Sequence, residues 1–161
     1  MLNKKWSSLD DERKTGGLKR GHFAEYYAEM QLTLYGFEVY KPLVDDRGID
    51  FIIRNQNRVF FDIQVKSTTD DKNIIITRNK FIPNEHLYLV AVQFVDEKEP
   101  EMYIIPSTKW ADPDSDKKIF YDSGVKNKKP QYGIELTDKK CVLLQEYKFE
   151  NYIKTIKNKK R

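Results

Sequence analysis

The sequence predicts an α/β protein, and three observations support this prediction. A stretch near the N-terminus has apolar residues at helical spacing, several short runs after it are rich in β-branched and aromatic residues, and a second helical pattern closes the chain. The 161 residues are enough for one domain with a real core, and no internal repeat is visible. We expect a polar arm over residues 1–17 and a single domain over residues 18–161, with a core at 19–110 and a peripheral part at 111–161.

The first element is a helix, predicted over residues 18–35 and stopped by Gly36. One apolar stripe along it predicts the core face: Phe23, Tyr27, Met30 and Leu34. A second stripe with small residues lies nearly opposite: Gly21, Glu25, Ala28 and Leu32. If this second stripe faces the strands, Glu25 points toward them. If only the first is buried, Glu25 is a solvent residue, and Glu29 is the fallback.

The next element is a hairpin with arms at 48–54 and 58–67, joined by an Asn-rich turn. Side chains alternate between the faces of a strand, so Asp62, Gln64 and Lys66 share one face. A three-residue loop places Asp50 opposite Asp62 and adds it to this polar row. A two-residue loop would shift the register by one and send Asp50 to the other face.

The residue types in this polar row suit the binding of a divalent metal ion and a phosphate. Carboxylate and amide oxygens are hard donors that suit Mg²⁺ or Mn²⁺. A lysine two residues further on can orient a water molecule or stabilise negative charge at a phosphate. A strand with one solvated face explains the same residues equally well, and both interpretations stay open here.

The other elements follow from shorter patterns. We predict strands at 36–42, 73–78, 87–95 and 101–105, short edge strands at 133–137 and 141–144, a short helix starting near 106–110, and a helix over 146–157. The 87–95 strand is the most apolar and should be central and buried. The last helix should dock through Phe149, Tyr152, Ile153 and Ile156.

Composition narrows the function classes. The single Cys141 excludes an internal disulfide and a cysteine-based zinc site, and the two histidines are far apart. No signal-like apolar segment is present and no apolar run approaches the ~18 residues of a membrane span, so we expect a cytoplasmic protein with no membrane partner. The net charge is +4. Basic clusters at 14–20, 126–129 and 148–161 suit a phosphate backbone, but a solvated surface and a frayed tail explain each one as well.

Four segments together resemble the PD-(D/E)XK nuclease superfamily, in particular its restriction-endonuclease-like and Holliday-junction-resolvase-like members. They are Gly21-x-x-Ala24-Glu25, Gly36-Phe37-x-Val39, Gly48-Ile49-Asp50-Phe51 and Ile63-Gln64-Val65-Lys66-Ser67. The resemblance covers roughly residues 19–106. It implies a restriction-endonuclease-like core with a central mixed β-sheet flanked by helices. It also implies a second core helix near residues 79–85, where Pro83 fits poorly.

The resemblance implies roles for particular residues. Asp50, Gln64 and Glu25 match the positions that hold Mg²⁺ or Mn²⁺, and Lys66 matches the catalytic lysine. Gln64 stands where the family has an acidic residue, which makes this a QxK variant with one negative charge fewer at the metal.

The implied partner is DNA. Phosphate contacts would come from the start of the first helix, through Lys19, Arg20 and His22. A homodimer is expected only at the level of the family, because many relatives dimerise to cut two strands.

The sequence therefore predicts a metal-dependent nuclease that hydrolyses DNA phosphodiester bonds. Two alternatives stay open. The first is a catalytically inactive nucleic-acid-binding domain on the same fold, which the neutral Gln64 would favour. The second is a protein-interaction module in which Trp6 and the region of Trp110 contact a partner.

Overall fold

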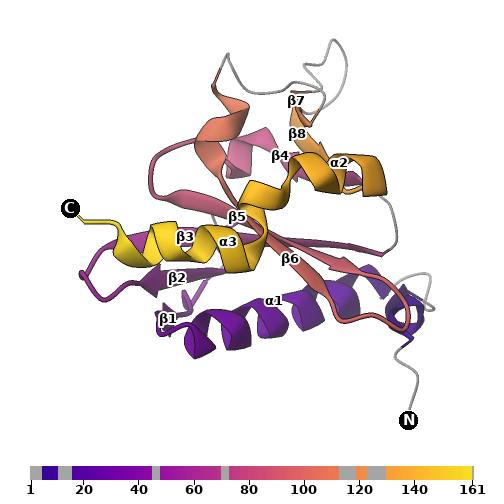
Figure 1. The fold of residues 1–161 in the computed structure, drawn as a ribbon, viewed down its shortest axis with the longest axis horizontal. Helices are drawn as coiled ribbons and strands as arrows, with labels where there is room; N and C mark the ends of the chain where they lie inside the picture. The colour runs from indigo at the N-terminus through magenta and orange to yellow at the C-terminus, as the bar shows by residue number, and fades with distance from the viewer. Residues whose placement is uncertain are drawn as a thin grey trace.

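The computed structural model of the protein describes residues 5–10, 16–44, 48–69, 73–112, 119–122 and 130–160. Its α-helices are α1 (Gly16–Leu34), α2 (Asp138–Leu143) and α3 (Phe149–Asn158). Its strands are β1 (Glu38–Tyr40), β2 (Phe51–Arg54), β3 (Phe60–Thr69), β4 (Asn73–Thr77), β5 (Leu87–Phe94), β6 (Glu101–Pro106), β7 (Phe120–Asp122) and β8 (Gln131–Glu135). Short 3₁₀ helices are η1 (Trp6–Asp10), η2 (Arg78–Lys80), η3 (Ser107–Trp110) and η4 (Gln145–Tyr147). Figure 1 shows their arrangement.

The central sheet has the strand order β1-β2-β3-β5-β6. Strands β3 and β5 are parallel, and the other neighbours are antiparallel, so the sheet is mixed. Every residue of β5 is buried, as expected for the most apolar run of the chain. The predicted α/β fold with a central mixed sheet flanked by helices is confirmed.

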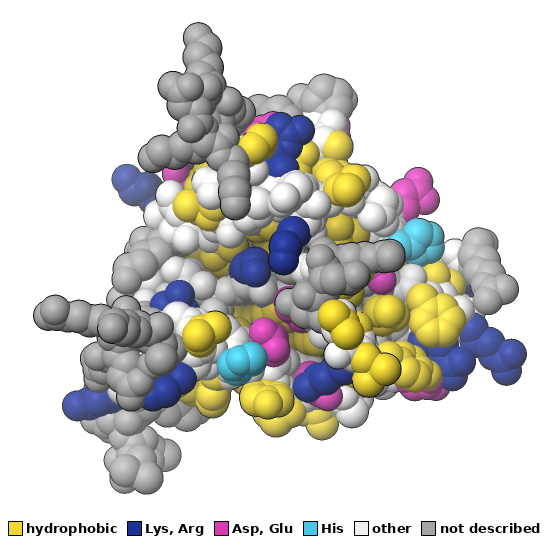
Figure 2. Space-filling model, turned by 180° about the vertical axis from the view of Figure 1, so that it is seen from behind, with side chains coloured by type: hydrophobic (Ala, Val, Ile, Leu, Met, Phe, Trp, Pro, Cys, Tyr) yellow, Lys and Arg dark blue, Asp and Glu magenta, His cyan; other side chains and the backbone are white. Residues whose placement is uncertain are grey.

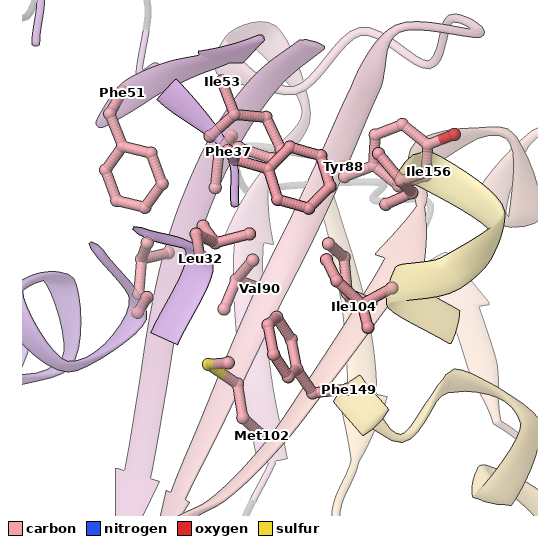
Figure 3. Close-up of a cluster of buried hydrophobic side chains, with 14 of the residues drawn as sticks. Leu32, Phe37, Phe51, Ile53, Tyr88, Val90, Met102, Ile104, Phe149 and Ile156 are labelled. Carbon is pink, nitrogen blue, oxygen red and sulfur yellow. The ribbon is translucent and has the colours of Figure 1, made fainter. Parts of the chain in front are cut away.

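One face of this sheet is covered by α1 and α3. Their buried residues pack together with the apolar row of β3 in a single cluster, part of which Figure 3 shows around Leu32, Val90 and Phe149. Burial of Phe149, Ile153 and Ile156 confirms the predicted docking face of the last helix.

Helix α1 corrects one expectation. Its fully buried stripe is Ala24, Ala28 and Leu32, whereas Met30 and Leu34 are more than half exposed. Small side chains let the helix backbone lie close to the sheet, so this stripe is buried and the larger residues are not. The prediction that the Phe23 stripe forms the core face is therefore wrong, although Tyr27 of that stripe packs at the edge of the core.

The other face of the central sheet carries a second layer. Strands β4, β8 and β7 form an antiparallel three-stranded sheet, visible at the top of Figure 1. Its apolar residues pack with Leu87, Leu89 and Ala91 of β5 and with Trp110 in a second core cluster. The predicted strand at 133–137 is therefore β8, although it begins two residues earlier.

Two further predictions change in this region. The segment 141–144 is not a strand: Cys141 to Leu143 end α2, and Val142 and Leu143 are exposed. In the described stretch between β4 and β5 there is no α-helix, only η2, so the second core helix implied by the resemblance is missing there.

Both ends of the described chain are tied to the domain. Trp6 packs against Phe23 and Phe94, and its indole N–H donates to the Lys98 carbonyl at 2.8 Å. At the other end, the Asn55 side-chain amide donates to the carbonyls of Ile156 and Lys159 at 2.9 and 2.8 Å. The C-terminal turn of α3 is therefore held by the hairpin loop and is not a frayed tail. The division into an arm and one domain stays a prediction.

No helix in the part of the chain that the structure describes is long and apolar enough to cross a membrane.

Candidate active site

The register of the hairpin brings Asp50 beside Gln64, not beside Asp62. Strand β2 pairs with β3 as Phe51 with Ile63 and Arg54 with Phe60. Continued by one residue, this register sets Asp50 opposite Gln64. The Asp50 N–H donates to the Ile63 carbonyl at 2.9 Å, and the Val65 N–H donates to the Asp50 carboxylate at 2.5 Å.

The loop is longer than the two- and three-residue alternatives considered from the sequence, because Arg58 does not continue the strand. Its φ of 61° places it in the left-handed region, and its N–H donates to the Asn55 carbonyl. The Asn55 side chain also accepts from the N–H groups of Asn57 and Val59, which organises a longer loop. The resulting register differs by two residues from that of a three-residue loop. A shift by an even number of residues keeps each side chain on the same face, so Asp50 joins the polar row.

Gln64 is the unusual member of this row. Only 4% of the residue is exposed, and its side-chain oxygen Oε1 is buried without a hydrogen-bond partner among the described residues. A buried polar atom in this state costs about 1–3 kcal/mol relative to one with a partner. It therefore marks a place where something outside the described residues completes the structure, or where the structure is strained.

Gly48 explains how Gln64 is held. The φ of Gly48 is +74°, and a Cβ at this position would lie 2.9 Å from the Gln64 Nε2 atom and 3.1 Å from the Lys80 Cβ. A side chain larger than hydrogen would displace the amide. The Gly48-Ile49-Asp50 segment thus packs against Gln64 on one side and against η2 on the other.

Asp62 and Lys66 flank Gln64 on the same face of β3. They pair with Leu87 and Ala91 of β5, as Gln64 does with Leu89, so the row lies on the face opposite α1. Both side chains are half-buried. Burial raises the pKa of the Asp62 carboxyl, and the nearby His86 opposes this shift. The predicted polar face is confirmed, but it borders the second layer and is not a freely solvated surface.

Glu25 lies on the flank of α1, next to the buried stripe. Its side chain is 34% exposed, and its carboxylate is 3.6 Å from the His22 Nδ1 atom. Glu29, the fallback, forms an ion pair with Lys41 at 2.6 Å, and that contact raises the pKa of Lys41. Burial of Ala28 and Leu32 turns this side of α1 toward the strands, but α1 packs on the sheet face opposite the polar row. Whether Glu25 reaches Asp50 stays a prediction.

The other predicted DNA-contacting residues are less well placed. Lys19 and His22 line a shallow groove on the outer side of α1 together with Phe23 and Tyr26. Arg20 is half-buried. Figure 2 shows the back of the molecule, where the described basic side chains are scattered among hydrophobic and acidic ones and do not gather in one patch.

The predicted basic clusters are only partly described, and two of their lysines are engaged in contacts. Within 148–161, Lys148 lies 3.6 Å from Glu101, and the Lys159 ammonium group donates to the Glu85 carbonyl at 3.0 Å. The cluster at 126–129 and Lys14 lie outside the described residues. Trp110 is buried, with its indole N–H bonded to the Gly133 carbonyl, so it does not offer a surface to a partner.

Sequence reasoning missed Lys80. This residue comes from η2, and its Cβ and carbonyl oxygen both approach Gly48 beside Gln64. The only signal for it was the position of the second core helix implied by the resemblance, and no helix forms there.

The donor set suits a hard divalent cation. Asp50 supplies a carboxylate, and Gln64 supplies a buried amide oxygen to which no described residue donates a hydrogen bond. Mg²⁺ and Mn²⁺ prefer oxygen donors of this kind. Among the described residues no group of three acidic, histidine or cysteine side chains converges on one point. The site therefore depends on the amide of Gln64 and does not have a full carboxylate set.

Comparison with known proteins finds no matching family model and no matching curated protein. Among solved structures, the bacterial homing endonuclease I-Ssp6803I superposes with a TM-score of 0.51 at 20% identity, covering 85% of this chain and 90% of that one. Hjc, a Holliday junction resolvase from Archaeoglobus fulgidus, gives a TM-score of 0.46 at 10% identity over 73% of this chain and 84% of that one. Together with the mixed sheet and the helix across it, the first likeness shows that the chain has a restriction-endonuclease-like fold.

Proposed function

We propose that the protein is a metal-dependent endonuclease that hydrolyses DNA phosphodiester bonds. One observation carries this proposal: a buried amide oxygen without a hydrogen-bond partner lies in the same row as Lys66 and beside Asp50. The likeness in fold to a homing endonuclease supports it.

In this proposal Asp50, Gln64 and Glu25 hold Mg²⁺ or Mn²⁺. When bound, such a cation polarises the phosphate and acidifies a water molecule. The backbone N–H of Val65 fixes the Asp50 carboxylate, and the tight packing of Gly48 fixes the Gln64 amide, so both donors are pre-positioned. Lys66, two residues along β3 on the same face, directs its charge to the same place and stabilises negative charge developing on the phosphate.

A cleavage assay tests the proposal. Supercoiled plasmid and branched DNA are incubated with Mg²⁺ or Mn²⁺ and with wild-type, Asp50→Asn or Lys66→Ala protein. Asp50→Asn keeps an acceptor for the Val65 N–H while removing the charge. We expect each substitution to reduce cleavage by roughly 10²–10³-fold or more, the scale of losing one pre-organised electrostatic contact.

The matched control is a half-buried ion pair outside the proposed site, Glu135 with Lys140 at 2.9 Å. Glu135→Gln and Lys140→Ala should cut like the wild type. An inert wild type, or equal cutting by all five proteins, would contradict the proposal.

A non-catalytic nucleic-acid-binding domain is the second candidate, and the neutral Gln64 favours it. It predicts DNA binding that neither needs nor responds to divalent cations, with no cleavage in the same assay.

A homodimer also stays a proposal. The described surface that suits it is the exposed apolar stripe of α1, formed by Phe23, Tyr26, Met30 and Leu34. Sedimentation over a range of protein concentrations reads the oligomeric state directly.

A further inference from the structure

A pocket of about 380 Å³ adjoins the proposed active site. It is lined by Ile49, Asp62, Asn79, Lys80, Ile82, Asn84 and Leu87. Ile49 precedes Asp50, and Asp62 is two residues before Gln64 on the same face of β3. Lys80 also packs against Gly48. The pocket and the Asp50–Gln64 pair are therefore parts of one surface.

The chemistry of the lining is that of a nucleobase site. Three aliphatic side chains, Ile49, Ile82 and Leu87, offer apolar walls. The Asp62 carboxylate stands among them, and no hydrogen bond to it is found in the part of the chain that the structure describes. Apolar walls with a small number of polar groups that fix orientation are what planar heterocycles need.

The loop that carries Ile82 is held rigidly on both sides. Before it, Phe81 is fully buried and its N–H donates to the Arg78 carbonyl at 3.1 Å. After it, the Asn84 N–H donates to the Ser107 hydroxyl, and this hydroxyl donates back to the Asn84 carbonyl, both at 2.9 Å. The Asn84 side chain in turn accepts from the His86 N–H at 2.8 Å.

Between these ties Ile82 is 71% exposed. A single exposed isoleucine is ordinary, but this one is fixed at the mouth of a pocket beside candidate metal ligands. Aliphatic side chains held in this way can enter between stacked bases and separate them.

The spacing along β3 is also informative. Asp62 and Gln64 are two residues apart, about 7 Å along a strand. Lys66 lies the same distance on the other side of Gln64. A DNA strand whose phosphate lies at Asp50 and Gln64 therefore reaches the pocket with an adjacent nucleotide.

We propose that this pocket holds one unstacked nucleobase of the DNA strand being cut, with Ile82 separating it from its neighbour and Asp62 accepting a hydrogen bond from its amino group. The inference rests on the proposed function and deepens it, because it names the substrate class as DNA in which a nucleotide can leave the stack. Mismatched, unpaired or branched DNA meets this requirement at the lowest cost. Bases with an exocyclic amino group should be preferred to thymine.

Fluorescence of 2-aminopurine tests the proposal. This adenine analogue is quenched while stacked, and it carries an amino group for Asp62. A set of duplexes and branched DNAs carries it at successive positions, and binding is measured with Ca²⁺ in place of Mg²⁺. The pocket walls are aliphatic, so an inserted base is not quenched again.

We expect the wild type to raise the fluorescence at least threefold at one position of the strand. Ile82→Ala, which removes the separating side chain, and Asp62→Ala, which removes the acceptor for the amino group, should each lose most of this rise. Ile75→Ala, which removes an exposed isoleucine of β4 outside the pocket, is the matched control and should keep it.

Two results would overturn the inference while leaving a nuclease in place: DNA that binds and is cut without a rise at any position, or the same rise with Ile82→Ala as with the wild type. If no DNA is bound or cut at all, the proposed function fails first, and this inference fails with it.

Discussion

Two buried glutamines on the same face of the central sheet have opposite environments. Gln64 of β3 and Gln93 of β5 are each 4% exposed. Gln93 pairs with Thr68, which lies on the same side of β3 as Gln64, so both side chains point toward the second layer.

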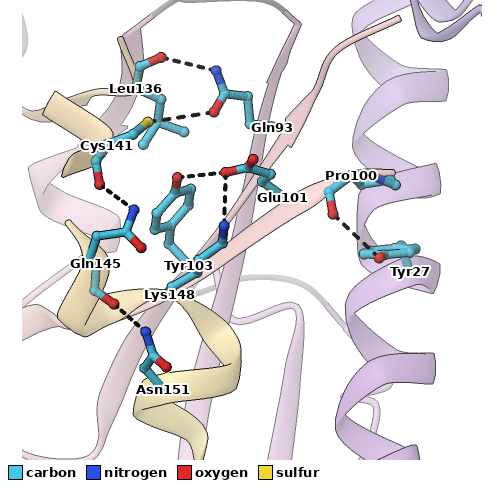
Figure 4. Close-up of polar contacts among 10 residues, drawn as sticks. All are labelled: Tyr27, Gln93, Pro100, Glu101, Tyr103, Leu136, Cys141, Gln145, Lys148 and Asn151. Atoms are coloured by element: carbon cyan, nitrogen blue, oxygen red, sulfur yellow. Dashed lines mark hydrogen bonds and ion pairs between the residues drawn. The ribbon is translucent and has the colours of Figure 1, made fainter. Parts of the chain in front are cut away.

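Both the nitrogen and the oxygen of the Gln93 side chain have hydrogen-bond partners, as Figure 4 shows. Its Nε2 atom donates to the Leu136 carbonyl at 3.0 Å, and its Oε1 atom accepts from the Cys141 thiol at 3.8 Å. These contacts join β5 to the segments that follow β8. Gln93 is therefore an architectural residue.

The Oε1 atom of Gln64 accepts no hydrogen bond from any residue that the structure describes. Its surroundings are Gly48, Asp50 and η2, which position the amide without satisfying its oxygen. The difference teaches that burial of an amide alone does not point to a site, whereas burial without a partner beside a fixed carboxylate marks a candidate for one. The cost of this arrangement would be offset when a cation binds.

The largest expected effect is a difference in stability between variants of the two glutamines. Gln93→Leu leaves the Leu136 carbonyl without its donor, so we expect the free energy of unfolding to fall by about 1–3 kcal/mol. Gln64→Leu removes an amide oxygen that had no partner, so stability in EDTA should stay level or rise by up to about 1 kcal/mol. Urea denaturation of both proteins in EDTA measures this contrast.

Equal losses of stability in the two proteins would break the comparison, because Gln64 would then be as architectural as Gln93. Cleavage per folded molecule should remain with Gln93→Leu and be lost with Gln64→Leu.

A smaller effect sharpens the same comparison. Cys141→Ala removes the thiol donor to Gln93 Oε1 and makes this oxygen resemble that of Gln64. The two residues line a pocket of about 460 Å³, where water can take the place of a weak thiol donor. We expect a loss of no more than about 0.5–1 kcal/mol in the free energy of unfolding. A loss of the size expected for Gln93→Leu would mean that an amide oxygen without a hydrogen-bond donor on this face lowers stability substantially.

Much of the fold was predictable because its signals are local and periodic. The hairpin, the buried β5 run and the last helix all have strong patterns, and alternation alone placed Asp62, Gln64 and Lys66 on one face. Asp50 joined this row only for a three-residue loop, and it lies there in the structure because the observed register differs from that one by an even number of residues.

The parts that failed depended on tertiary contacts. Helix α1 is apolar on both sides, so its pattern does not tell which stripe is buried, and close packing of Ala24 and Ala28 decides it. The run Cys141 to Leu144 has β-forming residues, yet it lies in and just after a short helix.

The open oxygen of Gln64 could not be predicted at all. It results from the packing of Gly48 and Lys80, residues that are distant from Gln64 in the sequence. The same holds for the pocket beside it, because Ile82 is held between Phe81, which bonds to Arg78, and Asn84, which bonds to Ser107.

The most direct test of this account is a Mn²⁺ titration followed by electron paramagnetic resonance of the free ion. The wild type, Asp50→Asn, Gln64→Leu and Gln93→Leu are compared at equal concentrations of folded protein. The account predicts one bound Mn²⁺ for the wild type and for Gln93→Leu, with affinity reduced at least about tenfold in Asp50→Asn and Gln64→Leu. Unchanged Mn²⁺ binding by Gln64→Leu would contradict it.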